Sequence, residues 1–172
     1  MNHDKYDDSY IRSILNDVKT VAIVGASANE SRPSLFVTKY LAGRGYKVFP
    51  INPGHETVGG IKAYAKLADV PEKIDMVDVF RRSEDIPKVL DEVLALPERP
   101  RVFWMQQGIR NDEAAARAEE TGMQVVMNRC PKIEYARLSG EIGWVGVNSR
   151  VISAKRTQRM DGGVQRLRLD KE

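Results

Sequence analysis

Five short apolar runs alternate with segments of helical character, and this alternation restricts the possible folds more than any other feature of the chain. Residues 34–42 read as a helix that ends at glycines. A second helical segment follows Ser83 and carries apolar residues at i, i+3, i+4, i+7 and i+8. A third begins at Asn111, is rich in alanine and stops at Gly122. The apolar runs are residues 20–24, 46–51, 74–80, 101–105 and 124–127.

This alternation predicts parallel strands that are joined by right-handed crossovers, with helices on both faces of one sheet. We therefore expect an α/β fold, a Rossmann-like three-layer sandwich with a mainly parallel five-stranded sheet. With the strands numbered along the chain, the expected order is 3-2-1-4-5, which brings the loops after the first four strands to one crevice. A helix over residues 8–17 is expected to precede the sheet and to pack against it.

The length of 172 residues suits one domain, which we place at residues 1–149, followed by a basic tail at residues 150–172. The tail has seven Lys or Arg against three Asp or Glu, a charge of +4, so a net charge of +3 leaves −1 for the first 149 residues. A near-neutral body argues against a dedicated nucleic-acid surface. A solvated tail, part of it disordered, is favoured over one that binds phosphates.

One cysteine, Cys130, and two histidines, His3 and His55, exclude a disulfide framework within the chain and predict no metal site. No apolar run approaches the length of a membrane span, and the first twenty residues are polar. We therefore expect a cytoplasmic protein without a membrane partner. Self-association is left open.

The loop after the first apolar run has the composition of an anion site. Open α/β sheets bind phosphates at this place, where free N–H groups and the dipole of the next helix favour negative charge. The dinucleotide and P-loop glycine patterns are both missing, since only Gly25 of either pattern is present. The expected ligand is a nucleotide or a phosphorylated cofactor. The loop residues expected around it are Gly25, Ala26, Ser27, Arg32, Pro33 and Ser34.

The ends of the later strands narrow the choice of ligand. The second strand lacks the acidic residue that usually holds the ribose of NAD, so NAD is disfavoured. The third ends in Arg81 and Arg82, which either grip a further phosphate or face solvent beside the acidic residues that follow. The fourth ends in residues 104–109, whose two glutamines and glycine turn offer hydrogen bonds.

Five motifs resemble the small stand-alone coenzyme A-binding proteins, which are similar to the amino-terminal coenzyme A-binding domain of the succinyl-CoA synthetase α subunit. They are VAIVGAS with RPS, GYKVFPINP, DMVDVFRR, WMQQGIRNDEAAARAEETG and VVMNRC, and the resemblance covers residues 21–138. It implies that the loop of residues 25–27 with 32–34 holds the diphosphate. It further implies an adenosine wall of Pro50, Asn52 and Pro53, a loop of Phe80, Arg81 and Arg82 that reads adenine and the phosphorylated ribose, and a pantetheine turn of Gln107, Gly108 and Ile109.

Cys130 follows the last strand, at the edge where a pantetheine thiol would arrive. It is either a buried, inert thiol or the partner of coenzyme A in a mixed disulfide, which would need a thiolate favoured by Arg129 or Lys132.

The leading functional hypothesis is binding of coenzyme A or an acyl-CoA by a carrier or regulatory module. The resemblance includes no ligase domain, so we assign no catalytic residue and do not expect autonomous ligase activity. One alternative is an NADP-dependent oxidoreductase or another dinucleotide-using enzyme. The other is a protein that binds a partner or nucleic acid through the basic tail, and this predicts binding that collapses with salt.

Overall fold

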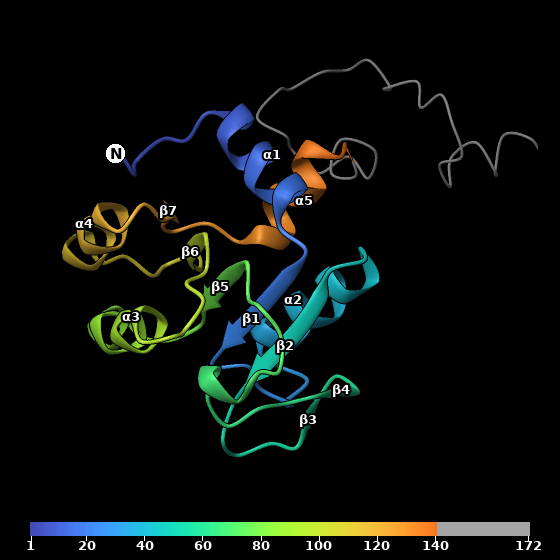
Figure 1. The fold of residues 1–172 in the computed structure, drawn as a ribbon. Coiled ribbons are helices and arrows are strands. Elements are labelled where there is room, and N and C mark those ends of the chain that lie inside the picture. The colour runs from blue at the N-terminus through green and yellow to red at the C-terminus, as the bar shows by residue number, and fades with distance from the viewer. Residues whose placement is uncertain (141–172) are drawn as a thin grey trace, which may run out of the picture.

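The computed structural model describes residues 1–140, in which a parallel five-stranded sheet lies between two layers of helices (Figure 1). The predicted tail at residues 150–172 and the end of the predicted domain at residue 149 lie outside the described residues. The predicted fold class is confirmed. Among residues 1–140, no helix is long and apolar enough to cross a membrane.

Strands and helices alternate along the chain as expected. The sheet consists of β1 (Thr20–Val24), β2 (Lys47–Ile51), β5 (Met76–Val79), β6 (Val102–Met105) and β7 (Gln124–Val126). The helices are α1 (Asp8–Asp17), α2 (Pro33–Gly43), α3 (Ile86–Leu94), α4 (Asp112–Glu120) and α5 (Pro131–Leu138). Between β2 and β5 lie the short antiparallel pair β3 (Thr57–Val58) and β4 (Ile61–Lys62) and a 3-10 turn at Leu67–Asp69, and a second 3-10 turn at Ser83–Asp85 precedes α3.

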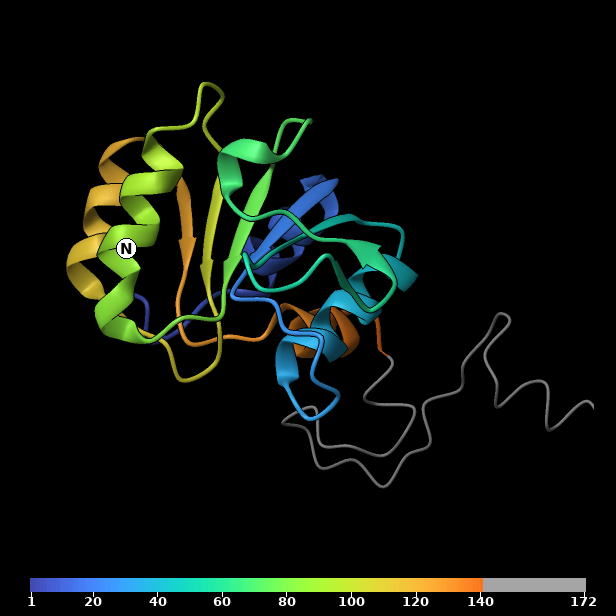
Figure 2. The same cartoon turned by 90° about the horizontal axis from the view of Figure 1, so that it is seen from below.

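The two faces of the sheet are covered by different helices (Figure 2). Helices α3 and α4 pack on one face, where their apolar side chains meet Val77 of β5 and Phe103 of β6. Helices α1, α2 and α5 cover the other face, where the next residues along the same strands, Asp78 and Trp104, point. Each strand therefore divides its side chains between two buried layers, which is why the runs are apolar at nearly every position.

The observed strand order corrects the expected order of 3-2-1-4-5. In the same numbering along the sequence, the sheet has the order 2-1-3-4-5, because β5 lies between β1 and β6. Pro50 explains why β2 is an edge strand, since proline has no N–H to donate to a further strand. The connection from β2 to β5 crosses β1 on the face of α3 and α4, where Leu67 joins the core. The point at which the strand order reverses therefore lies between β1 and β5.

Groups outside the sheet bond to both of its outer strands. At β7, the hydroxyl of Tyr10 donates to the carbonyl of Val125 at 3.2 Å, and the N–H of Met127 donates to the hydroxyl of Tyr6 at 2.7 Å. At β2, the carbonyl of Pro50 accepts the N–H of Tyr64 at 2.9 Å. The residues just before α1 and at its start thus lie along β7, as the residues after β4 lie along β2.

Candidate ligand-binding site

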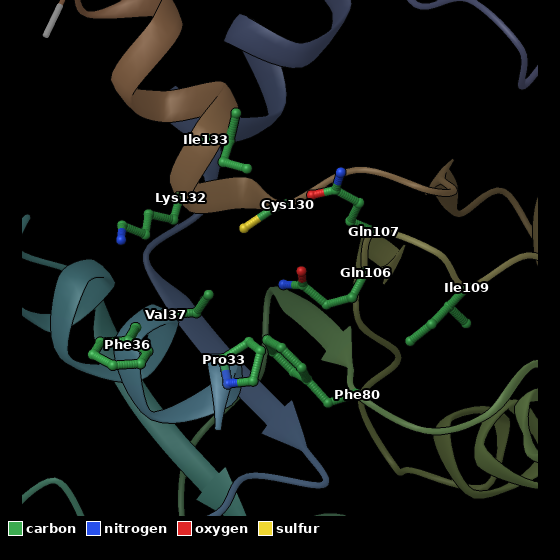
Figure 3. A pocket seen from close by; sticks show the side chains of 10 residues that line it. All are labelled: Pro33, Phe36, Val37, Phe80, Gln106, Gln107, Ile109, Cys130, Lys132 and Ile133. Atoms are coloured by element: carbon green, nitrogen blue, oxygen red, sulfur yellow. The ribbon is translucent and has the colours of Figure 1, made fainter. Parts of the chain in front are cut away.

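A cavity of about 460 Å³ opens at the carboxyl ends of the strands, on the face of α2 and α5 (Figure 3). Its size falls within the usual range for small-molecule sites. Six of the ten side chains that line it are apolar, and Gln106, Gln107, Cys130 and Lys132 supply the polar groups. The apolar lining consists of Pro33, Phe36, Val37, Phe80, Ile109 and Ile133.

Gly25 brings the loops after three strands into contact. Its φ is +82°, and a Cβ atom there would lie 2.8 Å from the carbonyl oxygen of Phe80 and 3.3 Å from Nε of Arg81. Its N–H donates to the carbonyl of Ile51 at 3.0 Å. Since other residues rarely adopt this φ and the Phe80 carbonyl is backbone, only glycine fits without strain. The predicted tight turn is therefore also the place where β1, β2 and β5 meet.

Several polar groups of the predicted anion loop form hydrogen bonds with one another. The N–H of Ser27 donates to Oγ of Ser34 at 3.1 Å, and the N–H of Asn29 donates to Oγ of Ser27 at 3.2 Å. Ser34 is buried, so its hydroxyl braces the loop. Arg32 is exposed at the N-cap of α2, and Pro33 occupies the first turn.

Asn52 ties the loop after β2 to the loop after β1. Its Nδ2 donates to the carbonyl of Ala26 at 2.6 Å, and its Oδ1 accepts the N–H of Gly54 at 2.8 Å. Pro53 is exposed beside it, whereas Pro50 is buried within β2 and lies outside the cavity lining. Of the three residues predicted as an adenosine wall, Asn52 and Pro53 therefore lie at the carboxyl edge of the sheet.

The two arginines after β5 occupy different surroundings. Arg81 is exposed next to the Gly25 turn and has no ion pair within residues 1–140. Arg82 lies 3.5 Å from Glu84, with both side chains more than two-thirds exposed, so this pair contributes little to stability. Neither arginine lines the cavity, while the ring of Phe80 does. The charged groups thus lie outside the mouth and the aromatic ring inside.

Hydrogen bonds hold the loop after β6 against the loop after β7. Gly108 has a φ of +82°, and its N–H donates to Oδ1 of Asn128 at 2.7 Å. The N–H of Asn128 donates to the carbonyl of Ile109 at 3.1 Å. Gln107 and Ile109 line the cavity from this loop, while Gly108 provides the turn between them.

A buried acid lies beneath the cavity. Nε2 of Gln106 donates to both carboxyl oxygens of Asp78, at 3.0 and 2.8 Å. Asp78 is fully buried and Gln106 is 4% exposed. Burial raises the pKa of Asp78 to about 8, and the hydrogen bond from Gln106 offsets only part of that effect. At neutral pH the acid is therefore mostly protonated.

Cys130 occupies the N-cap position of α5 and faces the cavity. Burial raises the pKa of this thiol, and backbone N–H groups of Ile133 and Lys132 reduce the effect. At neutral pH the sulfur is therefore mostly the thiol, so it reacts more slowly than an activated cysteine. Nζ of Lys132 lies 6.0 Å from the centre of the Phe36 ring and 5.8 Å from that of Tyr40.

The structure brings five of the predicted site residues into the cavity lining and adds residues that the sequence reasoning missed. Gln106, one of the two glutamines expected to offer hydrogen bonds after the fourth strand, also lines the cavity. The missed residues are four side chains of the helical walls. Pro131 directly after Cys130 was the available signal for α5, because proline favours the first helical position. No group of three His, Cys, Asp or Glu in the described part of the chain converges as a metal site. The added wall residues are Phe36, Val37, Lys132 and Ile133.

Together, the fold and the cavity define a Rossmann-like α/β protein with a cavity of small-molecule size at the carboxyl edge of its sheet. The cavity is mainly apolar, and the arginines after β5 lie outside it. The chain belongs to the CoA binding domain family, whose model matches residues 19–136. The family expected from the five motifs is therefore confirmed.

Relatives of similar length share most of the described chain. The uncharacterized protein YneT of Bacillus subtilis is 40% identical over 126 residues, which are 73% of this chain and 92% of that protein. A hypothetical protein from Pyrococcus horikoshii has a TM-score of 0.75 at 37% identity and covers 81% of this chain and 97% of its own. A Thermus thermophilus structure, cell-free ID.343, has a TM-score of 0.72 at 41% identity, with coverage of 77% and 99%.

A larger enzyme shares only part of the chain. The ADP-forming acetate–CoA ligase of Methanocaldococcus jannaschii is 38% identical over 74 residues, which are 43% of this chain and 10% of the ligase. This chain therefore resembles one segment of that enzyme.

Proposed function

We propose that the protein binds coenzyme A or an acyl-CoA as a carrier or regulatory module, without ligase activity of its own. The observation that carries the proposal is the position of Phe80. Its ring lines the cavity, while its carbonyl packs against the turn at Gly25. A ligand that follows the β1 turn towards Phe80 therefore reaches the mouth of the cavity directly.

The chemistry of coenzyme A matches this division of charged and apolar groups. Its diphosphate and 3′-phosphate carry the negative charge and would lie along the loops after β1, β2 and β5. Arg81 is exposed and has no carboxylate partner within residues 1–140, so it is available to a phosphate. Arg82 would exchange its exposed contact with Glu84 for a phosphate at little cost. The narrow pantetheine arm would enter the cavity between Phe80 and Ile109.

The match to the CoA binding domain family supports a binding role. The matched ligase is shared over 10% of its length, so its reaction is not carried over to this chain. The cavity itself presents amides, a thiol and a lysine among apolar side chains.

Titration calorimetry with coenzyme A, dephospho-coenzyme A, NAD and NADP under reducing conditions tests the proposal. We expect the double variant Arg81→Ala, Arg82→Ala to bind coenzyme A about tenfold or more weakly than the wild type, since one charge-assisted hydrogen bond is worth about 1.5–3 kcal/mol. The affinity for dephospho-coenzyme A, which lacks the ribose phosphate, should fall by a smaller factor in the same variant. Arg99→Ala is the matched control, because Arg99 precedes β6 and lies at the opposite edge of the sheet.

Two results would contradict this assignment. Equal losses of affinity for coenzyme A and dephospho-coenzyme A would mean that the two arginines do not bind the ribose phosphate. Binding of NADP without any binding of coenzyme A would overturn the proposed function and favour a dinucleotide-using enzyme.

A further inference from the structure

The residues just before α1 contact both of the loops that follow β6 and β7, and we call residues 3–6 the N-terminal strap. Asp4 joins the two loops, since its carboxylate accepts a hydrogen bond from Nη1 of Arg110 at 2.5 Å and its carbonyl accepts one from Nη2 of Arg129 at 3.3 Å. Each arginine is next in the chain to a residue that lines the cavity. The strap therefore ties together two loops that carry part of the cavity lining.

Tyr6 connects the strap to the start of the loop after β7. Its oxygen accepts the N–H of Met127 at 2.7 Å, and the guanidinium of Arg129 lies 5.5 Å from the centre of its ring. Asn128, the residue after Met127, accepts the N–H of Gly108 at 2.7 Å. The position of the Tyr6 hydroxyl therefore bears on the glycine turn between the two cavity residues of the loop after β6.

A buried histidine fixes the direction of the Tyr6 hydroxyl. His3 is 8% exposed, its Nδ1 lies 2.8 Å from the oxygen of Tyr6, and its Nε2 lies 3.4 Å from Oε1 of Glu119. Since a carboxylate only accepts hydrogen bonds, Nε2 carries the proton of the neutral ring, and Nδ1 accepts the O–H of Tyr6. The oxygen of Tyr6 is then free to accept the N–H of Met127. Neutral His3 thus completes a row of hydrogen bonds from α4 to the loop after β7.

Protonation of His3 breaks this row. A proton on Nδ1 points at the Tyr6 oxygen, so the O–H of Tyr6 loses its acceptor. Burial lowers the pKa of His3 below its usual 6.5, and the N-terminal ammonium and Arg110 act in the same direction, whereas Glu119 and Asp112 of α4 act against it. His3 is therefore mostly neutral at neutral pH and becomes protonated only as the pH falls below 6.5.

We propose that Tyr6, held by neutral His3, is a positioning residue for the pantetheine half of the ligand site. This inference rests on the proposed function, since it takes the cavity to bind the pantetheine arm. Within residues 1–140 the strap forms hydrogen bonds and ion pairs with α4 and with the loops after β6 and β7, and none with the loops after β1, β2 or β5. Loss of the Tyr6 hydroxyl therefore disturbs the walls around the arm and leaves the loops assigned to the phosphates in place.

Calorimetry on the full chain with two ligands tests this role. Adenosine 3′,5′-bisphosphate carries the adenosine end of coenzyme A and lacks the pantetheine arm. At about pH 7.5 we expect Tyr6→Phe to bind coenzyme A about three- to tenfold more weakly than the wild type, the factor that corresponds to one lost hydrogen bond, and to bind the bisphosphate equally well. Tyr10→Phe is the matched control, because it removes a hydroxyl that bonds to Val125 within β7 and not to the loop, so it should leave both affinities unchanged.

The pH dependence gives a readout that a purely structural role would not change. Between about pH 7.5 and about pH 5, the affinity of the wild type for coenzyme A should fall more steeply than that of His3→Gln, whose side chain does not titrate. Ionisation of the ligand is common to both proteins, so it does not contribute to the difference.

Two results would overturn the inference. One is an equal loss of affinity for both ligands in Tyr6→Phe, since this would mean that the whole site is disturbed. The other is an identical pH profile in the wild type and His3→Gln, a comparison that decides the question if thermal unfolding shows that Tyr6→Phe does not fold. A wild type that does not bind coenzyme A would instead overturn the proposed function and this inference with it.

Discussion

Replacing Asp78 by asparagine should make the protein more stable than the wild type at about pH 9, while the two should be nearly equally stable at about pH 4. Asp78 is fully buried, and its carboxyl meets only the amide of Gln106 among the hydrogen-bonding groups of residues 1–140. Ionisation in that position places a charge where no cation faces it. Asparagine keeps the shape of the side chain and removes that charge.

The size of the effect follows from the pKa of the acid. Burial raises the pKa of Asp78 from its usual 3.8 to about 8. One pKa unit corresponds to about 1.4 kcal/mol, so ionisation costs the folded state at most about 6 kcal/mol. Between the two pKa values the folded state holds a proton that the unfolded chain has released, so wild-type stability falls as the pH rises from about 4 to about 8. The variant lacks this slope.

Urea denaturation at a series of pH values measures this difference as the free energy of unfolding. We expect the variant to exceed the wild type by about 2–6 kcal/mol above pH 8. Parallel curves for the two proteins across the whole range would refute the reasoning, since they would mean that Asp78 does not titrate differently on folding.

Asp75→Asn is the matched control, because it changes an aspartate three residues earlier with the opposite behaviour. Burial acts to raise the pKa of Asp75, but hydrogen bonds from the N–H groups of Lys19 and Thr20 and from the Thr20 hydroxyl outweigh it and lower the pKa. Its carboxylate therefore stabilises the fold above the usual pKa, and this contribution is lost as the pH falls through the lowered one. We expect Asp75→Asn to be less stable than the wild type at neutral pH, with the difference shrinking in acid.

Two further predictions concern the site. Gly25→Ala should destabilise the fold by about 2 kcal/mol or more and weaken coenzyme A, because it combines a φ of +82° with a contact of 2.8 Å to the Phe80 carbonyl. Gly60→Ala is the control, because Gly60 has the same φ and no atom lies within 4 Å of a Cβ placed there. A similar loss of stability in both variants would mean that the contact with the Phe80 carbonyl does not contribute. The thiolate of Cys130 should attack coenzyme A disulfide, form a mixed disulfide with one coenzyme A and release the other as a thiol. Because burial raises the pKa of Cys130, this reaction should become faster as the pH rises. Intact mass under non-reducing conditions detects the adduct, and an equal adduct on Cys130→Ser would contradict it.

The layers of the fold could be predicted from the sequence because the strand and helix periods are clear. The order of the strands was predicted wrongly, since alternation alone does not say on which side of β1 a later strand pairs. Pro50 carried the missing signal, because a strand with a proline is suited to an edge.

The strand-end residues of the candidate site could be predicted for a related reason. Parallel strands bring their carboxyl ends to one edge, so Phe80, Gln107 and Ile109 meet there in either strand order. The helical walls could not be placed, because the side of α2 and α5 that faces the strand ends depends on how the helices pack. The role of Asp78 was hidden within an apolar run, where its burial is visible only in three dimensions.

The tyrosines along β7 also bear on how copies of this chain can meet. Strand edges with free N–H and C=O groups recruit further strands and so promote aggregation. Here the hydroxyls of Tyr6 and Tyr10 occupy the outward groups of Met127 and Val125. Tyr64 occupies the corresponding position on the opposite edge. Growth of the sheet from one molecule into the next is therefore blocked at these positions, and loss of the residues that carry Tyr6 and Tyr10 would expose one edge to such growth.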